Sequence, residues 1–143
     1  MDRGLDTTFL VQADVVGHPQ HAAARATLER MLEAGDRLVL APQVLAEFVH
    51  VVTDSKRFAR PLDVRAAVAR ADAWWNAEEV RQVSPDDSAV RLFMAWMTRH
   101  RLGRKRLLDT LLAATYHTSG VGSIVSTNGR DFAVFGCFEV VST

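Results

Sequence analysis

The sequence predicts an α/β fold in which helices cover both faces of a mostly parallel sheet. Short apolar segments alternate along the chain with longer segments whose apolar residues recur at helical spacing. This alternation is typical of parallel sheets, because their strands are buried on both faces and are connected by helices. Glycine and proline residues at the segment borders agree with this interpretation, since they favour helix ends and helix starts.

The expected elements alternate from one end of the chain to the other. A strand followed by a turn is expected at 5–10, and further strands are expected at 37–41, 80–83, 123–127 and 138–141. Helices are expected at 19–34, 42–52, 62–78, 84–101 and 107–119. A turn is expected at 128–131, where the sequence reads Asn-Gly-Arg-Asp.

Capping residues should mark the borders of the helices. Gly35, Gly103 and Gly120 each follow a helical segment, at the place where a glycine ends a helix. Pro42 suits the first position of the helix expected at 42–52. Ser84 suits the capping position of the helix expected at 84–101.

Composition and charge restrict the class of protein. The chain has 143 residues, which fits a single domain spanning 1–143. The formal net charge is zero, so any contact with nucleic acid must come from a local basic patch. The single cysteine allows no intramolecular disulfide, and no apolar run is long enough to span a membrane. We therefore expect a cytoplasmic protein without membrane contact.

Asp6 stands where the first expected strand meets the first expected helix. Open parallel sheets bind ligands at the carboxyl ends of their strands, which makes this carboxylate a candidate for a site. Taken alone, such an aspartate is explained by a turn or by helix capping, a role for which Thr7 and Thr8 also compete. Three further acids give it more weight, because each lies at or near a comparable junction: Glu47, Asp109 and Asp131.

Each of these three acids also has a purely structural explanation. Glu47 lies in a helix with one apolar face and suits a position that faces solvent. Asp109 lies at the start of a nearly all-apolar helix, where the helix dipole favours an acid. Asp131 belongs to a turn signal. The functional alternative is that the four carboxylates converge on one cleft.

Carboxylates gathered in one cleft have a specific chemistry. They repel one another, which raises their pKa values unless a cation binds between them. Oxygen ligands without a thiol or a required histidine favour Mg²⁺ or Mn²⁺ over zinc. Such an ion can orient or deprotonate a water for in-line attack on a phosphodiester. The acidic residues therefore indicate metal-dependent cleavage of a nucleic acid.

Four segments that carry or adjoin these acids stand in a fixed order along the chain: Leu5–Leu10, Pro42–Phe48, Leu108–Ala114 and Ser126–Phe132. Together they resemble the PIN-domain family, and within it the VapC-type ribonuclease toxins. The resemblance implies a three-layer α/β/α sandwich and a metal-dependent endoribonuclease, the toxin of a type II toxin–antitoxin pair. It further implies Mg²⁺ or Mn²⁺ as cofactor, RNA as substrate, a small antitoxin protein as partner, and a homodimer.

The resemblance also assigns residues position by position. It implies catalytic, metal-binding carboxylates at Asp6, Glu47 and Asp109, with Asp131 as the fourth acid. Neighbouring residues are expected beside the site in an auxiliary role: Thr7, Thr127 and Asn128.

The chain departs from the family pattern at two places. Family members often carry an acid where this chain has Asn128, so the last metal contact is Asn128, Asp131 or neither. Arg3 and Gly4 stand where aliphatic residues are usual, so the first strand is expected to be short.

A basic cluster precedes Asp109 in the sequence. Arg104, Lys105 and Arg106 are explained either as a solvated helix end or as a rim that grips RNA phosphates beside the acids. The second interpretation assigns RNA binding to all three residues and would let a neutral protein hold RNA.

Other functions remain compatible with the sequence. One is a housekeeping PIN-domain nuclease without an antitoxin, and another is a catalytically inert binding module with the PIN fold. Phosphatases of the haloacid-dehalogenase type also place an aspartate after the first strand. They usually need a second aspartate two residues on, where this chain has Thr8.

An antitoxin would have to reach the acidic site. A groove that could anchor its apolar side chains is expected between two helices, one carrying Phe48 and Val52 and the other carrying Leu28 and Met31. A basic residue of the antitoxin would then pair with Asp6 and Asp109 in place of the cation.

Overall fold

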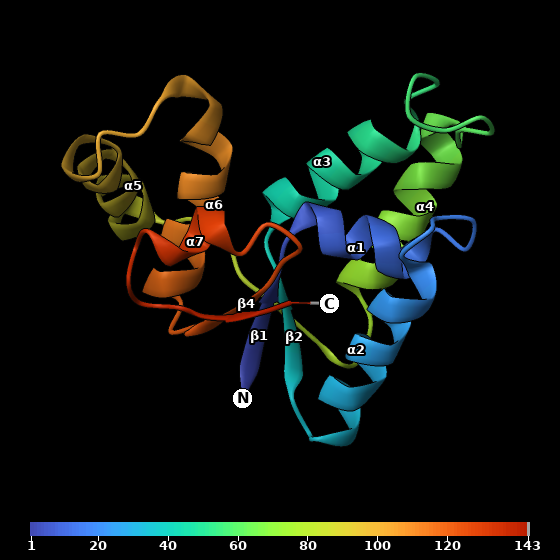
Figure 1. Ribbon diagram of the computed structural model, residues 1–143, viewed down its shortest axis with the longest axis horizontal. Coiled ribbons are helices and arrows are strands. Elements are labelled where there is room, and N and C mark those ends of the chain that lie inside the picture. The colour runs from blue at the N-terminus through green and yellow to red at the C-terminus, as the bar shows by residue number, and fades with distance from the viewer. Residues whose placement is uncertain (143) are drawn as a thin grey trace.

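The computed structural model describes residues 1–142, in which a five-stranded sheet lies between two groups of helices (Figure 1). The strands are β1 (Asp2–Leu5), β2 (Arg37–Leu40), β3 (Val80–Gln82), β4 (Ser123–Val125) and β5 (Glu139–Val141). Their order in the sheet is β3-β2-β1-β4-β5, and every pairing is parallel. The parallel sheet expected from the sequence is confirmed.

The helices form the two outer layers of the sandwich. Figure 1 shows the first group on one side of the sheet: α1 (Thr7–Asp14), α2 (His21–Glu33), α3 (Pro42–Val52) and α4 (Val64–Trp75). The second group lies on the other side: α5 (Asp87–Arg99), the 3₁₀ turn η1 (Arg104–Arg106), α6 (Leu107–Thr118) and α7 (Arg130–Ala133). The three-layer α/β/α arrangement is thus confirmed. None of these helices within residues 1–142 is long and apolar enough to cross a bilayer.

The path of the chain through the sheet reverses after β3. The chain first steps outward from β1 to β2 and β3, and then returns to place β4 against the other side of β1. The carboxyl ends of β1 and β4 therefore meet at a topological switch point, where open α/β sheets bind ligands. Asp6 directly follows β1, and Ser126 directly follows β4.

The helix starts are set by aspartates rather than by the expected hydroxyl residues. Helix α1 is capped by Asp6 and not by Thr7 or Thr8, while α5 is capped by Asp86 and not by Ser84. In both helices the carboxylate accepts the backbone N–H three residues further on. That bond satisfies one of the donors that the start of a helix leaves free.

The helix ends follow the expected glycines in two of three cases. Gly35 and Gly120 adopt the left-handed conformation, with φ of 81° and 80°. Helix α5 instead ends before Gly103, because the left-handed residue is Arg101, with φ of 51°. The N–H of Leu102 then donates to the carbonyl oxygen of Met97 at 3.0 Å, which closes the helix without the glycine.

Several elements are shorter than the sequence pattern suggests. The helices expected at 19–34 and 62–78 begin later and end earlier, at the bounds of α2 and α4. The strand expected at 123–127 ends at Val125 and leaves Ser126 and Thr127 in the following loop. The turn expected at 128–131 leads directly into α7, a one-turn helix that the sequence pattern did not indicate.

Gly4 allows the ring of Tyr116 to lie directly against β1. A Cβ atom at position 4 would stand 2.7 Å from two carbons of that ring. Tyr116 is fully buried, and its hydroxyl donates to the carbonyl oxygen of Leu5 at 2.5 Å, with that of Val39 at 3.1 Å. Burial raises the pKa of the Tyr116 hydroxyl well above its usual value. The tyrosine thereby ties α6 to β1 and β2, which explains a glycine within a strand.

Arg3 belongs to a polar network at the amino ends of the strands. Its guanidinium donates to Asp36 at 2.9 Å, to Ser123 at 2.9 Å and to Glu139 at 3.2 Å. This network, at the edge of the sheet opposite to Asp6, explains the arginine in a position where an aliphatic residue was expected.

Candidate active site

Asp6 is held at the switch point of the sheet by two hydrogen bonds to its carboxylate. One oxygen accepts the backbone N–H of Phe9 at 2.8 Å, and the other accepts the hydroxyl of Ser126. The backbone N–H of Asp6 donates to the carbonyl oxygen of Val125 at 3.3 Å. Asp6 is 6% exposed, so β1, α1 and β4 together set the orientation of an almost fully buried acid.

The surroundings of Asp6 make its ionised form unfavourable. Burial is the main reason why the pKa of Asp6 rises from the usual 3.8 to about 6. The hydrogen bonds from Ser126 and Phe9 lower this pKa, whereas the charges of Asp109 and Glu47 raise it. At neutral pH the carboxylate is ionised in spite of its burial, a condition that a bound cation would relieve.

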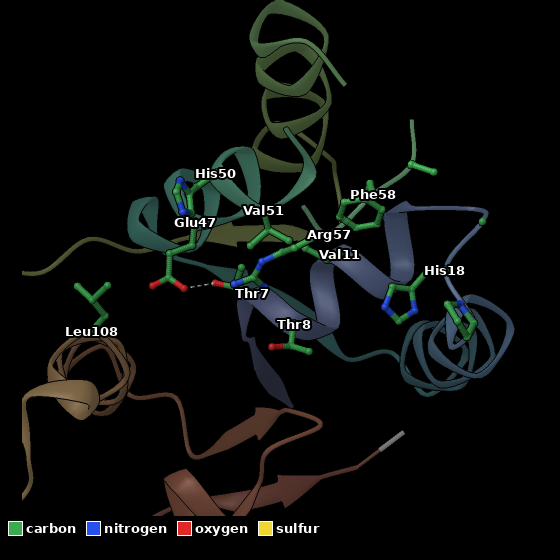
Figure 2. A pocket seen from close by; sticks show the side chains of 13 residues that line it. Thr7, Thr8, Val11, His18, Glu47, His50, Val51, Arg57, Phe58 and Leu108 are labelled. Carbon is green, nitrogen blue, oxygen red and sulfur yellow. Dashed lines mark hydrogen bonds between the residues drawn. The ribbon is translucent and has the colours of Figure 1, made fainter. Parts of the chain in front are cut away.

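Glu47 reaches the same region from α3, which packs against α1. The hydroxyl of Thr7, the first residue of α1, donates to the Glu47 carboxylate at 3.2 Å (Figure 2). Burial raises the pKa of Glu47, the Thr7 hydrogen bond lowers it, and the charge of Asp109 raises it. Glu47 is therefore a half-buried acid directed toward the site, and not the solvent-facing residue that the structural alternative required.

Asp109 lies in the first turn of α6 and is partly buried. Burial raises its pKa, the charge of Asp131 adds to this increase, and Arg106 opposes it. Asp109 also raises the pKa values of Asp6 and Glu47. The charge of Asp109 therefore acts on Asp6 and Glu47, and Asp109 in turn is affected by the charge of Asp131.

The loop after β4 brings Asp131 to this group and leaves its neighbours in solvent. Asp131 belongs to α7, whereas Thr127 and Asn128 are exposed. The backbone N–H of Asn128 donates to the Ser126 hydroxyl oxygen at 2.9 Å. Of the two residues considered for the last metal contact, Asp131 is the one whose charge acts on Asp109.

The basic cluster divides into two parts. The Arg106 side chain is partly buried, donates to the backbone carbonyl of Asp131 and lies 3.9 Å from the Asp131 carboxylate. Arg104 and Lys105 are exposed. Arg106 therefore holds α7 against the start of α6, while the other two cations remain available to a ligand.

Ser126 is a site residue that the sequence pattern did not single out. Its hydroxyl donates to Asp6 and accepts the N–H of Asn128, so it links the buried acid to the loop that carries Asp131. A signal for it was present, because a hydroxyl residue directly after a buried apolar strand occupies the same place on β4 as Asp6 does on β1.

The acids as a set fit a hard divalent cation in their chemistry. The donors are carboxylate oxygens, which suit Mg²⁺ or Mn²⁺. None of the ion pairs formed by residues 1–142 involves Asp6, Glu47 or Asp109. In the same residues, no three acidic, histidine or cysteine side chains already stand close enough to hold a metal ion. A bound ion would draw the carboxylates closer together than they stand in this structure.

A cleft of about 790 Å³ opens beside Glu47, between α1, α3 and the segments 17–19 and 57–59 (Figure 2). Its apolar lining includes Val11, Val51 and Phe58. The groove expected from the sequence was placed wrongly, because its four proposed residues are at most 5% exposed: Leu28, Met31, Phe48 and Val52. These side chains belong to the buried core, which helical spacing alone could not distinguish from an exposed apolar face.

The family model of the PIN domain matches residues 5–136, a range that includes all four candidate acids. The chain belongs to the PIN domain family. No curated protein sequence matches this PIN domain.

Solved structures share the fold of this PIN domain over nearly its whole length. The Mycobacterium tuberculosis toxin VapC20, described as cleaving the sarcin-ricin loop, has 23% identity and a TM-score of 0.71, with 96% of this chain and 98% of that chain covered. A chain of Rickettsia felis VapBC2, solved with a promoter DNA fragment, has 17% identity and a TM-score of 0.72, covering 100% and 99%. VapBC-1 of nontypeable Haemophilus influenzae has 16% identity and a TM-score of 0.67, with 99% of this chain and 98% of that chain covered.

Asp6→Asn should stabilise the metal-free PIN domain near neutral pH. The folded pKa of Asp6 lies above its usual value, so ionisation destabilises the folded state as the pH rises from about 4 to about 6. The amide removes this penalty, and we expect a gain of about 1–3 kcal/mol in unfolding free energy at pH 7. Urea denaturation in EDTA measures it. The difference between variant and wild type should vanish near pH 4, and a difference independent of pH would contradict the argument.

Proposed function

We propose that this PIN domain is a metal-dependent endoribonuclease and the toxin of a type II toxin–antitoxin pair. The observation that carries the proposal is that Asp6, Glu47 and Asp109 come from three different elements, each has a raised pKa, and the charge of Asp109 contributes to the increase at the other two. Asp6 also caps α1, but capping does not require the almost complete burial of this acid, and none of the three acids forms an ion pair within residues 1–142. Perturbed carboxylates gathered at a switch point are typical of a catalytic centre.

The likeness to solved structures supports the class of reaction. Proteins with this fold include a toxin that cleaves the sarcin-ricin loop and chains of several toxin–antitoxin complexes. The inert-module alternative is disfavoured, because a binding module gains nothing from burying mutually repelling carboxylates.

Asp6, Glu47, Asp109 and Asp131 would hold the divalent cation. When bound, the ion supplies positive charge that activates a water and stabilises the oxygen leaving the phosphorus. The protein supplies the orientation: Ser126 and the N–H of Phe9 fix the Asp6 carboxylate, and Thr7 directs Glu47 toward it.

Asp6→Asn, Glu47→Gln and Asp109→Asn should each reduce Mg²⁺-dependent RNA cleavage by at least about 100-fold and leave the fold intact. Each substitution preserves the size of the side chain and removes one negative charge from the ligand set. Cleavage of a labelled RNA under single-turnover conditions measures the effect, and Glu29→Gln, at an exposed acid of α2 outside the candidate set, serves as a matched control. Wild-type rates in two of the three variants would refute the assigned site.

The exposed cations before α6 are proposed to hold RNA. Replacing Arg104 and Lys105 together with Gln should weaken RNA binding and reduce its salt dependence, because about one counterion fewer is released for each lost phosphate contact. Single-turnover cleavage at saturating RNA should change little. Fluorescence anisotropy at several salt concentrations measures the slope, and a slope equal to that of wild type would place the RNA elsewhere. Arg106→Gln is predicted to act differently, by loosening α7 and with it Asp131.

A toxin of this kind requires a protein that inhibits it in its own cell. A basic side chain of such an antitoxin would neutralise the carboxylates in place of the cation, since a guanidinium pairs well with a carboxylate. Expression of the chain alone should arrest growth of a bacterial host, expression of Asp6→Asn should not, and affinity purification from the native source should recover a small partner protein. If the chain is purified without a partner protein and its expression does not arrest growth, the housekeeping PIN-domain nuclease is the better account.

A further inference from the structure

The cleft beside Glu47 is large enough to hold a small ligand. Its volume of about 790 Å³ lies within the range of about 300–1,000 Å³ that small-ligand sites occupy. Figure 2 shows Glu47 and Thr7 at one end and His18 at the other, with Phe58 and Arg57 between them. A ligand that reaches the acids from this side must therefore pass along the cleft.

Part of the lining of the cleft is apolar. Val11 and Val51, from α1 and α3, lie beside the ring of Phe58, which is partly buried against the core. The ring is held by this packing, yet it still lines an open cavity. A fixed aromatic ring of this kind is a stacking surface for a planar group such as a nucleobase.

The polar part of the lining consists mainly of hydrogen-bond donors. Arg57 is 61% exposed and makes one ion pair, at 3.4 Å to Asp54, which leaves most of its N–H groups free for a ligand. The backbone N–H of Gln20 donates to Nδ1 of His18 at 3.0 Å, so the proton of the neutral His18 ring is on Nε2. Among the described residues that line the cleft, Glu47 is the sole acid.

We propose that this cleft is a nucleotide subsite, in which the base of a single-stranded RNA stacks on Phe58 and its phosphate binds Arg57 and His18. The subsite rests on the proposed ribonuclease function, because it receives the nucleotide adjacent to the phosphodiester held at Asp6 and Glu47. Donors facing an apolar floor match a ligand that is rich in acceptors, negatively charged and partly planar. The basic tail of a protein inhibitor matches the carboxylates better than it matches Arg57.

Anisotropy with a labelled single-stranded RNA of about 12 nucleotides tests the proposal. The assay is run in EDTA, so that binding is measured without cleavage. Arg57→Gln should weaken binding and reduce its salt dependence by about one phosphate contact. Phe58→Leu, which retains apolar packing but removes the ring, should weaken binding about tenfold. Arg65→Gln removes an exposed arginine of α4 outside the cleft and should bind like wild type after correction for net charge.

The outcomes separate the subsite from the proposed activity. Weaker binding by both cleft variants supports the subsite, even if the wild-type chain cleaves no RNA. Wild-type binding by both variants overturns the subsite, even if the wild-type chain cleaves RNA. If RNA binding is unchanged while binding of a recovered protein partner is lost, the cleft belongs to that partner and the proposal fails. If Arg57→Gln has the same midpoint of thermal unfolding as the wild type, misfolding is excluded as the cause of its weaker RNA binding.

Discussion

The burial of the Asp6 carboxylate is the constraint on which the rest of the site depends. This acid is 6% exposed, and the Phe9 N–H and the Ser126 hydroxyl both donate to it, which offsets part of the cost of burying its charge. These donors belong to α1 and to the loop after β4, so the acid joins two elements that are distant in sequence. The reversal of strand order at β1 and β4 makes this junction possible.

The hydrogen bonds to Asp6 do not bring its pKa back to the usual value. Its pKa remains near 6 because burial and the charges of Asp109 and Glu47 outweigh the two donors. Burial also raises the pKa values of Glu47 and Asp109. A fold optimised for stability alone would place a cation or an apolar residue here, and under the proposed function a divalent ion would relieve the repulsion.

Basic and aromatic residues lie on two sides of the acids. Arg106 is engaged with Asp131 and secures α7, while Arg104 and Lys105 face solvent beside it. On the other side of the acids, the cleft offers a ring and hydrogen-bond donors. An overall neutral protein can therefore present local surfaces that suit a polyanion on both sides of its acidic centre.

The sequence by itself determined the layers of the fold and singled out the acids of the proposed site. Alternating apolar segments predicted the parallel sheet, and Gly35 and Pro42 marked helix borders that the structure confirms. Local signals were less reliable where two residues compete for one role. Asp6 and not Thr7 caps α1, and Arg101 and not Gly103 ends α5, because hydrogen bonds to specific backbone groups decide between them.

Only the tertiary structure decided which side chains meet. The role of Ser126 depends on the pairing of β1 with β4, across 120 residues of chain. The presence of Gly4 in a strand is understood only with the Tyr116 ring against it. The spacing of Leu28 and Phe48 predicts an exposed apolar face, yet both residues lie in the core, whereas Arg57 and Phe58 reach the cleft from a loop without periodicity. Periodicity reports which residues share a face, but the neighbour that covers the face is chosen by long-range packing.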